Sequence, residues 1–255
     1  MWVHDLRDAD DDCGGKAVGL ARLIAAGLPV PDGFVIDDGA FRAIVGELAG
    51  ELDGAGHALE QAARRIAAAE LPRELTAEVA ARAARLGPLV AVRSSATIED
   101  GAAGAAAGVF SSRTAVPVDQ VWTAIRAVWT SALTPLAAAY ARRRGGAIDT
   151  PQRSALLRAP AKPGLAIAIG VIVQRYVAGE LVTVYTRPPG EPETREMVIQ
   201  RSGRLERGDV PLARAAEAAI GAEATGADVE LVADQLVQAR PIVHPQPRAL
   251  VPPPP

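Results

Sequence analysis

The pattern of hydrophobic and polar positions predicts helices in the first half of the chain. Three alanine-rich stretches read as helical, namely 16–26, 58–86 and 118–144. In the third stretch the apolar side chains recur at three- and four-residue spacing, as one buried helical face requires. These positions are Val121, Ile125, Val128, Ala132 and Leu136. Pro72 divides the second stretch into two helices, because proline is excluded from helix interiors.

Short apolar runs bounded by turn residues predict strands, mostly in the second half. The run 89–93 (LVAVR) lies between Gly-Pro and Ser-Ser pairs, which is typical of a buried strand. The runs 167–177 and 181–186 predict two strands of a hairpin, with residues 178–180 as its turn. Further strands are expected at 193–200 and within 229–239, the latter with a turn at Ala233 and Asp234.

These elements predict an α+β fold in two lobes. Residues 145–164 mix Gly, Pro and charge without a period and are expected to link the halves. We therefore expect a helix-rich first lobe over 1–163, a lobe built on an antiparallel sheet over 164–244, and a proline-rich tail over 245–255. A cleft between the lobes is the default position for a ligand.

Composition narrows the class of protein. The chain has 255 residues, of which 49% are hydrophobic and 22% charged, as in ordinary globular proteins. Its net charge of −3 argues against a nucleic-acid partner. The longest apolar run, 164–173, is about half the length that a membrane span needs. With a polar start unlike a signal peptide and a single cysteine, Cys13, a cytoplasmic protein is expected.

The first candidate for chemistry is the segment Gly14-Gly15-Lys16, directly before a predicted helix. Paired glycines let the backbone approach a ligand closely, and a helix start attracts anions. Lys16 would add a positive charge for a phosphate. The alternative is a turn followed by a solvated lysine. Cys13 lies beside an acidic run and is expected to be unreactive.

The second candidate lies at the end of the predicted strand 89–93. Arg93 is followed by Ser94 and Ser95, and then by the small-residue loop 101–108 (GAAGAAAG). Such a loop could close over an anion as a flap. The alternative is a surface loop with Arg93 in an ion pair with Glu99 or Asp100.

The third candidate is a group of polar residues in the last predicted hairpin. Asp228 and Glu230 share one strand face, and Gln238 and Arg240 share a face of the next strand, because strand side chains alternate. Carboxylate and amide oxygens suit Mg²⁺, and the arginine fork suits phosphate. The alternative is an exposed polar face of an edge hairpin.

Together these segments resemble one known family. The stretches 14–36, 90–100 (VAVRSSATIED), 170–177 (GVIVQRYV) and 228–241 are similar to motifs in the N-terminal, ATP-grasp-like nucleotide-binding domain of phosphoenolpyruvate synthase and pyruvate phosphate dikinase. The resemblance extends over about residues 10–243.

The resemblance implies a role for each matching residue. Lys16, Arg93 and Ser94 would lie at the ATP phosphates, and Arg240 would stabilise charge on the terminal phosphoryl group. Glu230 and Gln238 would hold Mg²⁺. The adenine pocket would be lined by Gln174, Tyr176 and Val177. The small-residue loop that ends at Gly108 would be the lid. Lys16, Arg93 and Arg240 would be the catalytic side chains.

The chain also departs from the family. It contains no T-x-H-x-A-like motif of a phosphohistidine domain, and the segment 178–186 is shorter than in the family. The expected function is therefore a Mg-ATP-binding subunit of a split phosphotransfer system that phosphorylates a histidine on a separate protein or domain. The alternatives are an inactive nucleotide-binding or scaffold module and an ATP-grasp ligase.

Overall fold

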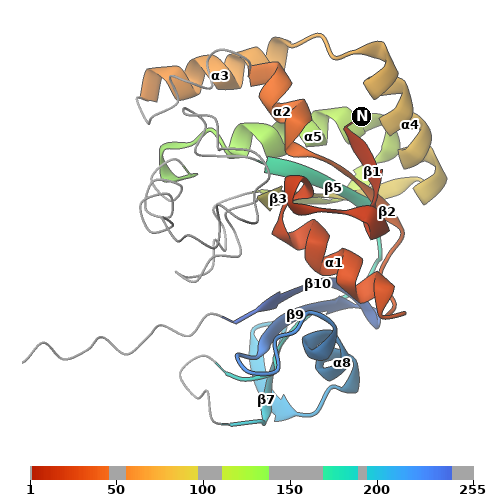
Figure 1. Ribbon diagram of the computed structural model, residues 1–255, viewed down its shortest axis with the longest axis vertical. Coiled ribbons are helices and arrows are strands. Elements are labelled where there is room, and N and C mark those ends of the chain that lie inside the picture. Colours follow the sequence, from red (N-terminus) through yellow and green to blue (C-terminus); the bar gives the residue numbers. More distant parts are fainter. Residues whose placement is uncertain (1, 46–55, 97–110, 138–168, 189–193, 243–255) are drawn as a thin grey trace, which may run out of the picture.

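The computed structural model describes residues 2–45, 56–96, 111–137, 169–188 and 194–242. They form two five-stranded antiparallel sheets with helices packed against them (Figure 1). This arrangement confirms the expected α+β fold with a helix-rich first lobe and a second lobe built on an antiparallel sheet.

The first sheet is assembled from strands that are distant in sequence. Its strand order is β1-β2-β5-β3-β4. The strands span Val3–Asp5 (β1), Gly33–Ile36 (β2), Leu89–Ala96 (β3), Ser112–Pro117 (β4) and Ile169–Arg175 (β5). Strand β5 lies at the centre, and its first six residues are buried, which explains why all of them except Gln174 are apolar.

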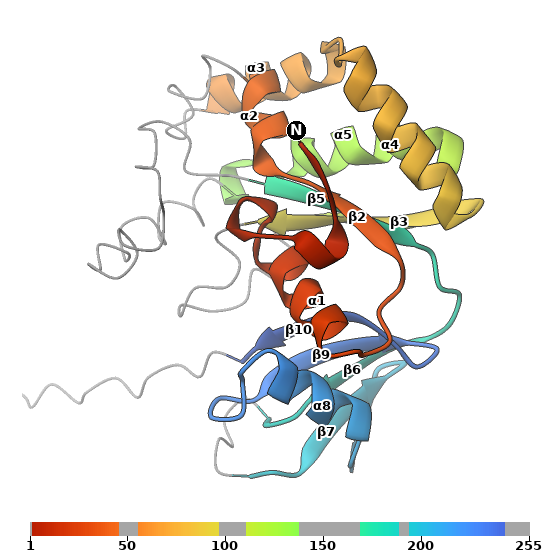
Figure 2. The same ribbon diagram turned by 45° about the vertical axis from the view of Figure 1, so that its right-hand side comes forward.

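Helices cover both faces of this sheet. Those on one face are α2 (Asp38–Val45), α3 (Gly56–Ala68), α4 (Arg73–Leu86) and α5 (Val121–Ser131), whereas α1 (Gly15–Ala25) lies on the other (Figures 1 and 2). Trp129 of α5 is fully buried and packs against Phe41 of α2, with ring centroids 6.5 Å apart. Pro72 separates α3 from α4, as predicted.

The second sheet has the order β10-β9-β6-β7-β8. Its strands span Leu181–Tyr185 (β6), Met197–Arg201 (β7), Arg204–Gly208 (β8), Ala227–Val232 (β9) and Gln235–Pro241 (β10), and α8 covers Pro211–Ala219. The turn between β9 and β10 is the predicted one. Ala233 and Asp234 both have positive φ angles, 46° and 58°, as a two-residue hairpin turn requires.

Helix α1 belongs to both lobes. Leu20 and Leu23 are buried in one apolar cluster with Val35 and Ile172 of the first sheet and Leu236 of the second. Figure 2 shows α1 between the two sheets. The lobes therefore share a core, and α1 fixes the position of one relative to the other.

Two sequence predictions are wrong. The runs 167–177 and 181–186 do not form a hairpin, because β5 pairs with β2 and β3 whereas β6 pairs with β7 and β9. The chain thus passes from the first sheet to the second after β5, and not at the expected boundary near residue 163. Matching hydrophobic patterns on adjacent strands cannot reveal that each has its partners elsewhere.

The predicted helix 118–144 is not one continuous helix, because α5 ends at Ser131 and helical residues resume at 135–137, where this described range ends. Residues Val118–Gln120 form a 3₁₀ turn (η4), and α5 ends at Ser131, where the Ser131 hydroxyl donates to the carbonyl oxygen of Val128. The end of the predicted stretch, from residue 138, lies outside the described residues, as do most of the predicted linker and the proline-rich tail. Within the described residues, no helix combines the length and apolarity needed to cross a bilayer.

We predict that Gly170→Ala destabilises the fold. A Cβ atom at Gly170 would lie 2.6 Å from the carbonyl oxygen of Cys13 and 3.0 Å from that of Ile36. Backbone atoms cannot move aside cheaply, so the free energy of unfolding should fall by about 1–3 kcal/mol. Urea denaturation measures this change.

Gly208→Ala is the matched control for this experiment. Its Cβ would meet only the Cδ1 atom of Ile199 at 3.4 Å, which is an ordinary contact. Equal unfolding midpoints for the two variants would contradict the close packing of β5 against the segment before α1.

Candidate functional site

The start of α1 is packed against the end of β3. Gly14 has a φ angle of 84°, and a Cβ atom there would lie 2.2 Å from the carbonyl oxygen of Ser95. The Ser95 hydroxyl oxygen accepts a hydrogen bond from the backbone N–H of Ala17 at 3.1 Å. Ser95, at the end of β3, therefore caps α1. The Gly14-Gly15-Lys16 segment and the end of β3, some 80 residues apart in sequence, thus form one surface.

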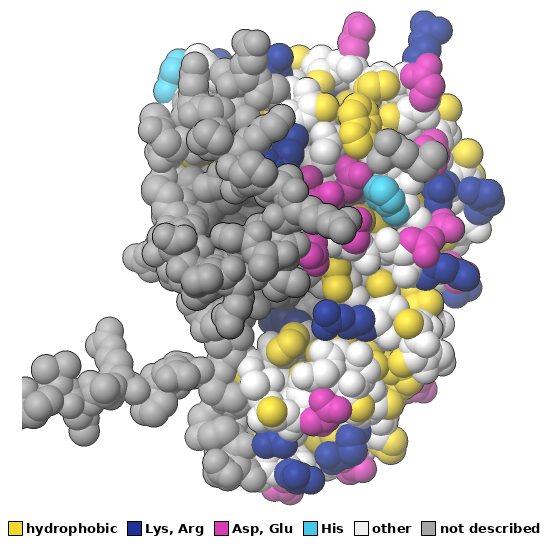
Figure 3. Space-filling view, in the orientation of Figure 1, with side chains coloured by type: hydrophobic (Ala, Val, Ile, Leu, Met, Phe, Trp, Pro, Cys, Tyr) yellow, Lys and Arg dark blue, Asp and Glu magenta, His cyan; other side chains and the backbone are white. Residues whose placement is uncertain are grey.

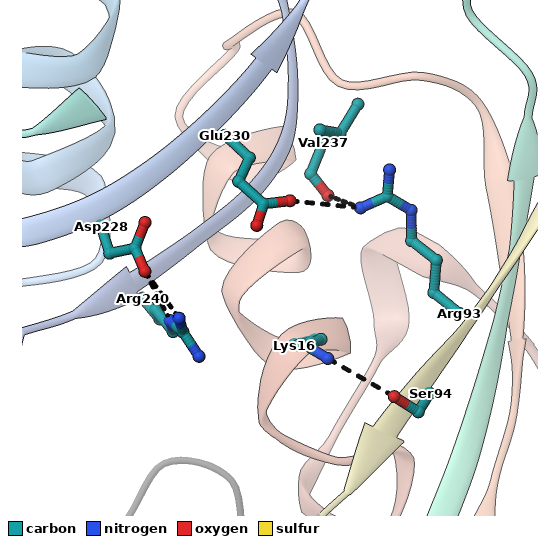
Figure 4. Close-up of polar contacts among 7 residues, drawn as sticks. All are labelled: Lys16, Arg93, Ser94, Asp228, Glu230, Val237 and Arg240. Carbon is teal, nitrogen blue, oxygen red and sulfur yellow. Dashed lines mark hydrogen bonds and ion pairs between the residues drawn. The ribbon is translucent and has the colours of Figure 1, made fainter. Parts of the chain in front are cut away.

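Lys16 lies in the first turn of α1, on this surface. Its Nζ atom is 3.5 Å from the Ser94 hydroxyl oxygen, and the side chain is half-buried (Figure 4). The positive end of the helix dipole lies at the same place. The structure thus brings Lys16 and Ser94 together.

Arg93 extends from β3 across to the second lobe (Figure 4). Its side chain is 13% exposed, and one guanidinium nitrogen lies 3.4 Å from the carbonyl oxygen of Val237 and 3.6 Å from a carboxylate oxygen of Glu230. Burial lowers the pKa of Arg93, although an arginine remains protonated. The observed ion pair is therefore with Glu230, while Glu99 and Asp100 lie outside the described residues.

The polar residues of the last hairpin lie in two cross-strand pairs. Gln238 is opposite Glu230, and Arg240 is opposite Asp228, so all four side chains share one face of the sheet. An irregularity between Leu236 and Gln238 shifts the register there.

Arg240 is held by Asp228. Its Nε and one terminal nitrogen donate to the same carboxylate oxygen of Asp228 at 3.0 and 2.6 Å. The other carboxylate oxygen, Oδ1, is buried without a hydrogen-bond partner. Asp228 thus orients the arginine. The sequence had placed Asp228 on one strand face with Glu230 but had indicated no role for it.

A pocket of about 230 Å³ opens next to Arg93. Among its lining residues are the predicted Gln174, Tyr176 and Val177, together with Leu181 and Val232 from the second lobe. The buried Gln174 amide donates to the Pro31 carbonyl oxygen at 3.1 Å, which fixes that wall. Both lobes therefore contribute to a largely apolar pocket beside the polar residues.

The donor atoms near Arg93 fit a magnesium ion only in part. Glu230 and Gln238 offer a carboxylate and an amide oxygen from neighbouring strands, which suits an ion that keeps waters and takes phosphate oxygens. The described part of the chain contains no group of three or more His, Cys, Asp or Glu side chains that could hold a metal by themselves. These residues fit magnesium that arrives with a phosphate ligand.

Acidic side chains gather near the start of α1. Burial raises the pKa of Asp12, and the charges of Asp38, Asp10 and Asp37 raise it further. Figure 3 shows acidic side chains clustered on this face of the first lobe. Their negative potential opposes an anion at Lys16. Gly108 and the rest of the predicted lid lie outside the described residues.

The two antiparallel sheets, joined through α1, form the two-lobed α+β fold of a nucleotide-binding domain. Residues 10–205 match the pyruvate phosphate dikinase AMP/ATP-binding domain, and the chain belongs to this family. The family match supports binding of AMP or ATP.

Two curated relatives are similar to this chain. Phosphoenolpyruvate synthase of Aeropyrum pernix is 32% identical over 159 residues, which cover 51% of this chain and 19% of that protein. The probable phosphoenolpyruvate synthase of Methanocaldococcus jannaschii is 27% identical over 233 residues, covering 82% of this chain and 18% of that protein. The similarity thus spans about a fifth of each relative.

We predict that Ser95→Ala lowers the free energy of unfolding by about 1–3 kcal/mol, because the buried N–H of Ala17 loses its acceptor. Ser94→Ala, which removes only the longer contact to Lys16, should cost less. Thermal or urea unfolding of both variants measures the difference. A larger loss for Ser94→Ala would contradict the capping role of Ser95.

The Cys13 thiol should be unreactive in the folded protein. Burial is the main cause that raises its pKa from 9.0 to about 12, so at pH 8 the thiolate is scarce. This agrees with the predicted lack of reactivity, although burial outweighs the acidic neighbours as its cause. A disulfide reagent should label the thiol slowly in the native protein and rapidly in urea.

The same shift makes stability depend on pH. The unfolded chain releases the thiol proton near pH 9, whereas the folded chain keeps it until about pH 12. The contribution of Cys13 to stability is therefore complete below pH 9 and is lost as the pH rises toward 12, by about 1.4 kcal/mol per pH unit. Cys13→Ala should lack this part of the decline, and identical pH profiles would contradict it.

Proposed function

We propose that this chain binds Mg·ATP in the cleft between its two sheets and transfers a phosphoryl or pyrophosphoryl group to a histidine on a partner protein or domain. The observation that carries the proposal is the meeting of Arg93 and Glu230 across the cleft, at 3.6 Å. Lys16 and Arg240 flank this contact from the two lobes, and the apolar pocket adjoins it (Figure 4).

The proposed binding mode follows from the positions of these groups. The adenine ring would occupy the pocket of about 230 Å³ beside Gln174, Tyr176 and Val177. The phosphates would then extend past Arg93 toward Lys16 and Arg240. Three cations along one path match a chain of negative phosphates.

Glu230 and Gln238 would hold the magnesium ion, which when bound neutralises phosphate charge. Glu230 would leave its ion pair with Arg93, and the freed guanidinium would turn to a phosphate oxygen. Because both side chains approach from different lobes, the same exchange would hold the two lobes on the nucleotide.

In the proposed transfer, the lone pair of a neutral imidazole nitrogen on the partner attacks the β-phosphorus of ATP. A nitrogen–phosphorus bond forms, and the bond between that phosphorus and the oxygen that bridges the α- and β-phosphates breaks. The bonding electrons pass to this oxygen, which leaves as part of AMP. Arg240, kept in place by Asp228, would stabilise charge on the transferred group. The residues of this chain supply position and charge rather than a covalent intermediate.

One observation favours a second candidate, a nucleotide-binding module without transfer. Both arginines of the cleft are already neutralised by carboxylates, Arg93 by Glu230 and Arg240 by Asp228. Such pairs compete with phosphate, and the acidic residues around Asp12 act in the same direction. ATP binding without any nucleotide cleavage would support this candidate.

Calorimetric titration with ATP and Mg²⁺ tests the binding step. Binding in the micromolar range is expected, and Lys16→Ala and Glu230→Ala should each weaken it about tenfold or more, because each removes a charged contact. Arg64→Ala serves as the control, since this arginine is 73% exposed on α3 and lies outside the cleft. No binding by the unaltered protein would refute the proposal.

The products test the transfer step. Incubation with ATP, Mg²⁺ and a candidate phosphohistidine domain should release AMP and label the acceptor histidine. Release of ADP that requires a carboxylate substrate would instead indicate a ligase. Binding without either product would leave the module without transfer as the better description.

A further inference from the structure

Tyr185 lies in the same cross-strand row as the Asp228–Arg240 pair. The register places Tyr185 of β6 directly opposite Asp228 of β9, and Asp228 opposite Arg240 of β10. Directly opposed residues on antiparallel strands project to the same face of a sheet. Tyr185 therefore belongs to the face that carries Glu230 and Gln238, although no sequence motif pointed to it.

The length of its side chain allows Tyr185 to reach beyond Asp228, its direct neighbour in the register. A tyrosine side chain is longer than that of an aspartate and similar in reach to an arginine. Asp228 Oδ1 remains without a hydrogen-bond partner, so the Tyr185 hydroxyl does not donate to this neighbour. Among the described residues none forms a hydrogen bond with the Tyr185 hydroxyl, which leaves it available to a ligand.

The electrostatic surroundings keep this hydroxyl protonated. Burial raises the pKa of Tyr185, the charges of Asp228 and Glu230 raise it further, and Arg240 lowers it. The Tyr185 hydroxyl thus keeps its proton at neutral pH, so it can donate a hydrogen bond in the same row as the Arg240 guanidinium.

We propose that Tyr185 is a further ligand-binding residue, whose hydroxyl donates a hydrogen bond to an oxygen of the terminal phosphates that Arg240 contacts. This inference rests on the proposed function and deepens it. Tyr185 and Arg240 would form a binding site with two hydrogen-bond donors for the end of the triphosphate. Asp228 holds Arg240 in place in this site. A nucleotide with a single phosphate, held by its adenine in the pocket beside Gln174, lacks the β- and γ-phosphates that would occupy this site.

The test compares Mg·ATP and AMP on the unaltered protein and Tyr185→Phe, by calorimetry. A hydrogen bond to a charged phosphate oxygen is lost in the variant, so its affinity for Mg·ATP should fall about tenfold. Its affinity for AMP should stay within about twofold of the unaltered value. The unfolding midpoint of the variant, expected to be unchanged, verifies that the sheet is intact.

Tyr176→Phe is the matched control, because Tyr176 lines the apolar pocket. Any effect of that substitution should change the affinities for Mg·ATP and AMP by the same factor. An equal loss of both affinities in Tyr185→Phe, or no loss at all, would overturn the inference while leaving the proposed function standing. An unaltered protein that binds neither nucleotide would instead refute the proposed function, and this inference with it.

Discussion

The contact between Gly14 and Ser95 is the constraint on which the rest of the site depends. It leaves no room for a side chain at Gly14, and the Ser95 hydroxyl oxygen accepts a hydrogen bond from the N–H of Ala17 in the first turn of α1. Helix α1 is in turn buried between both sheets. The contact therefore sets the position of Lys16 and, through the body of the helix, the position of the second lobe.

The site contains arginines that could attract an anionic ligand, and carboxylates that pair with these arginines in its place. Each arginine of the cleft has a carboxylate partner, which lowers the cost of burying the cation. The two pairs differ in geometry. Asp228 takes two hydrogen bonds from Arg240 through one oxygen, whereas Glu230 meets Arg93 at a longer distance. The second pair is thus the weaker one, and its members come from different lobes.

Local sequence predicted the parts of this fold that depend on local interactions. The helix break at Pro72, the strand after Pro88 and the turn at Ala233 and Asp234 each follow from backbone preferences. The motifs also indicated Lys16, Arg93, Glu230, Gln238 and Arg240, which the structure brings to one cleft. The false hairpin between β5 and β6 shows the limit, because strand partners are chosen by long-range burial. Tyr185 escaped notice for the same reason, since its neighbours are defined only by register.

The place of β5 in the first sheet has a consequence for how the chain folds. This strand is the centre of the sheet, between β2 and β3, yet it follows them by some 130 and 70 residues in the sequence. During synthesis the ribosome would release most of the first lobe before its central strand exists, leaving the inner edges of β2 and β3 open. The lobe has a high contact order, and its completion must wait for residues 169–175, so its folding is set by the arrival of one late segment.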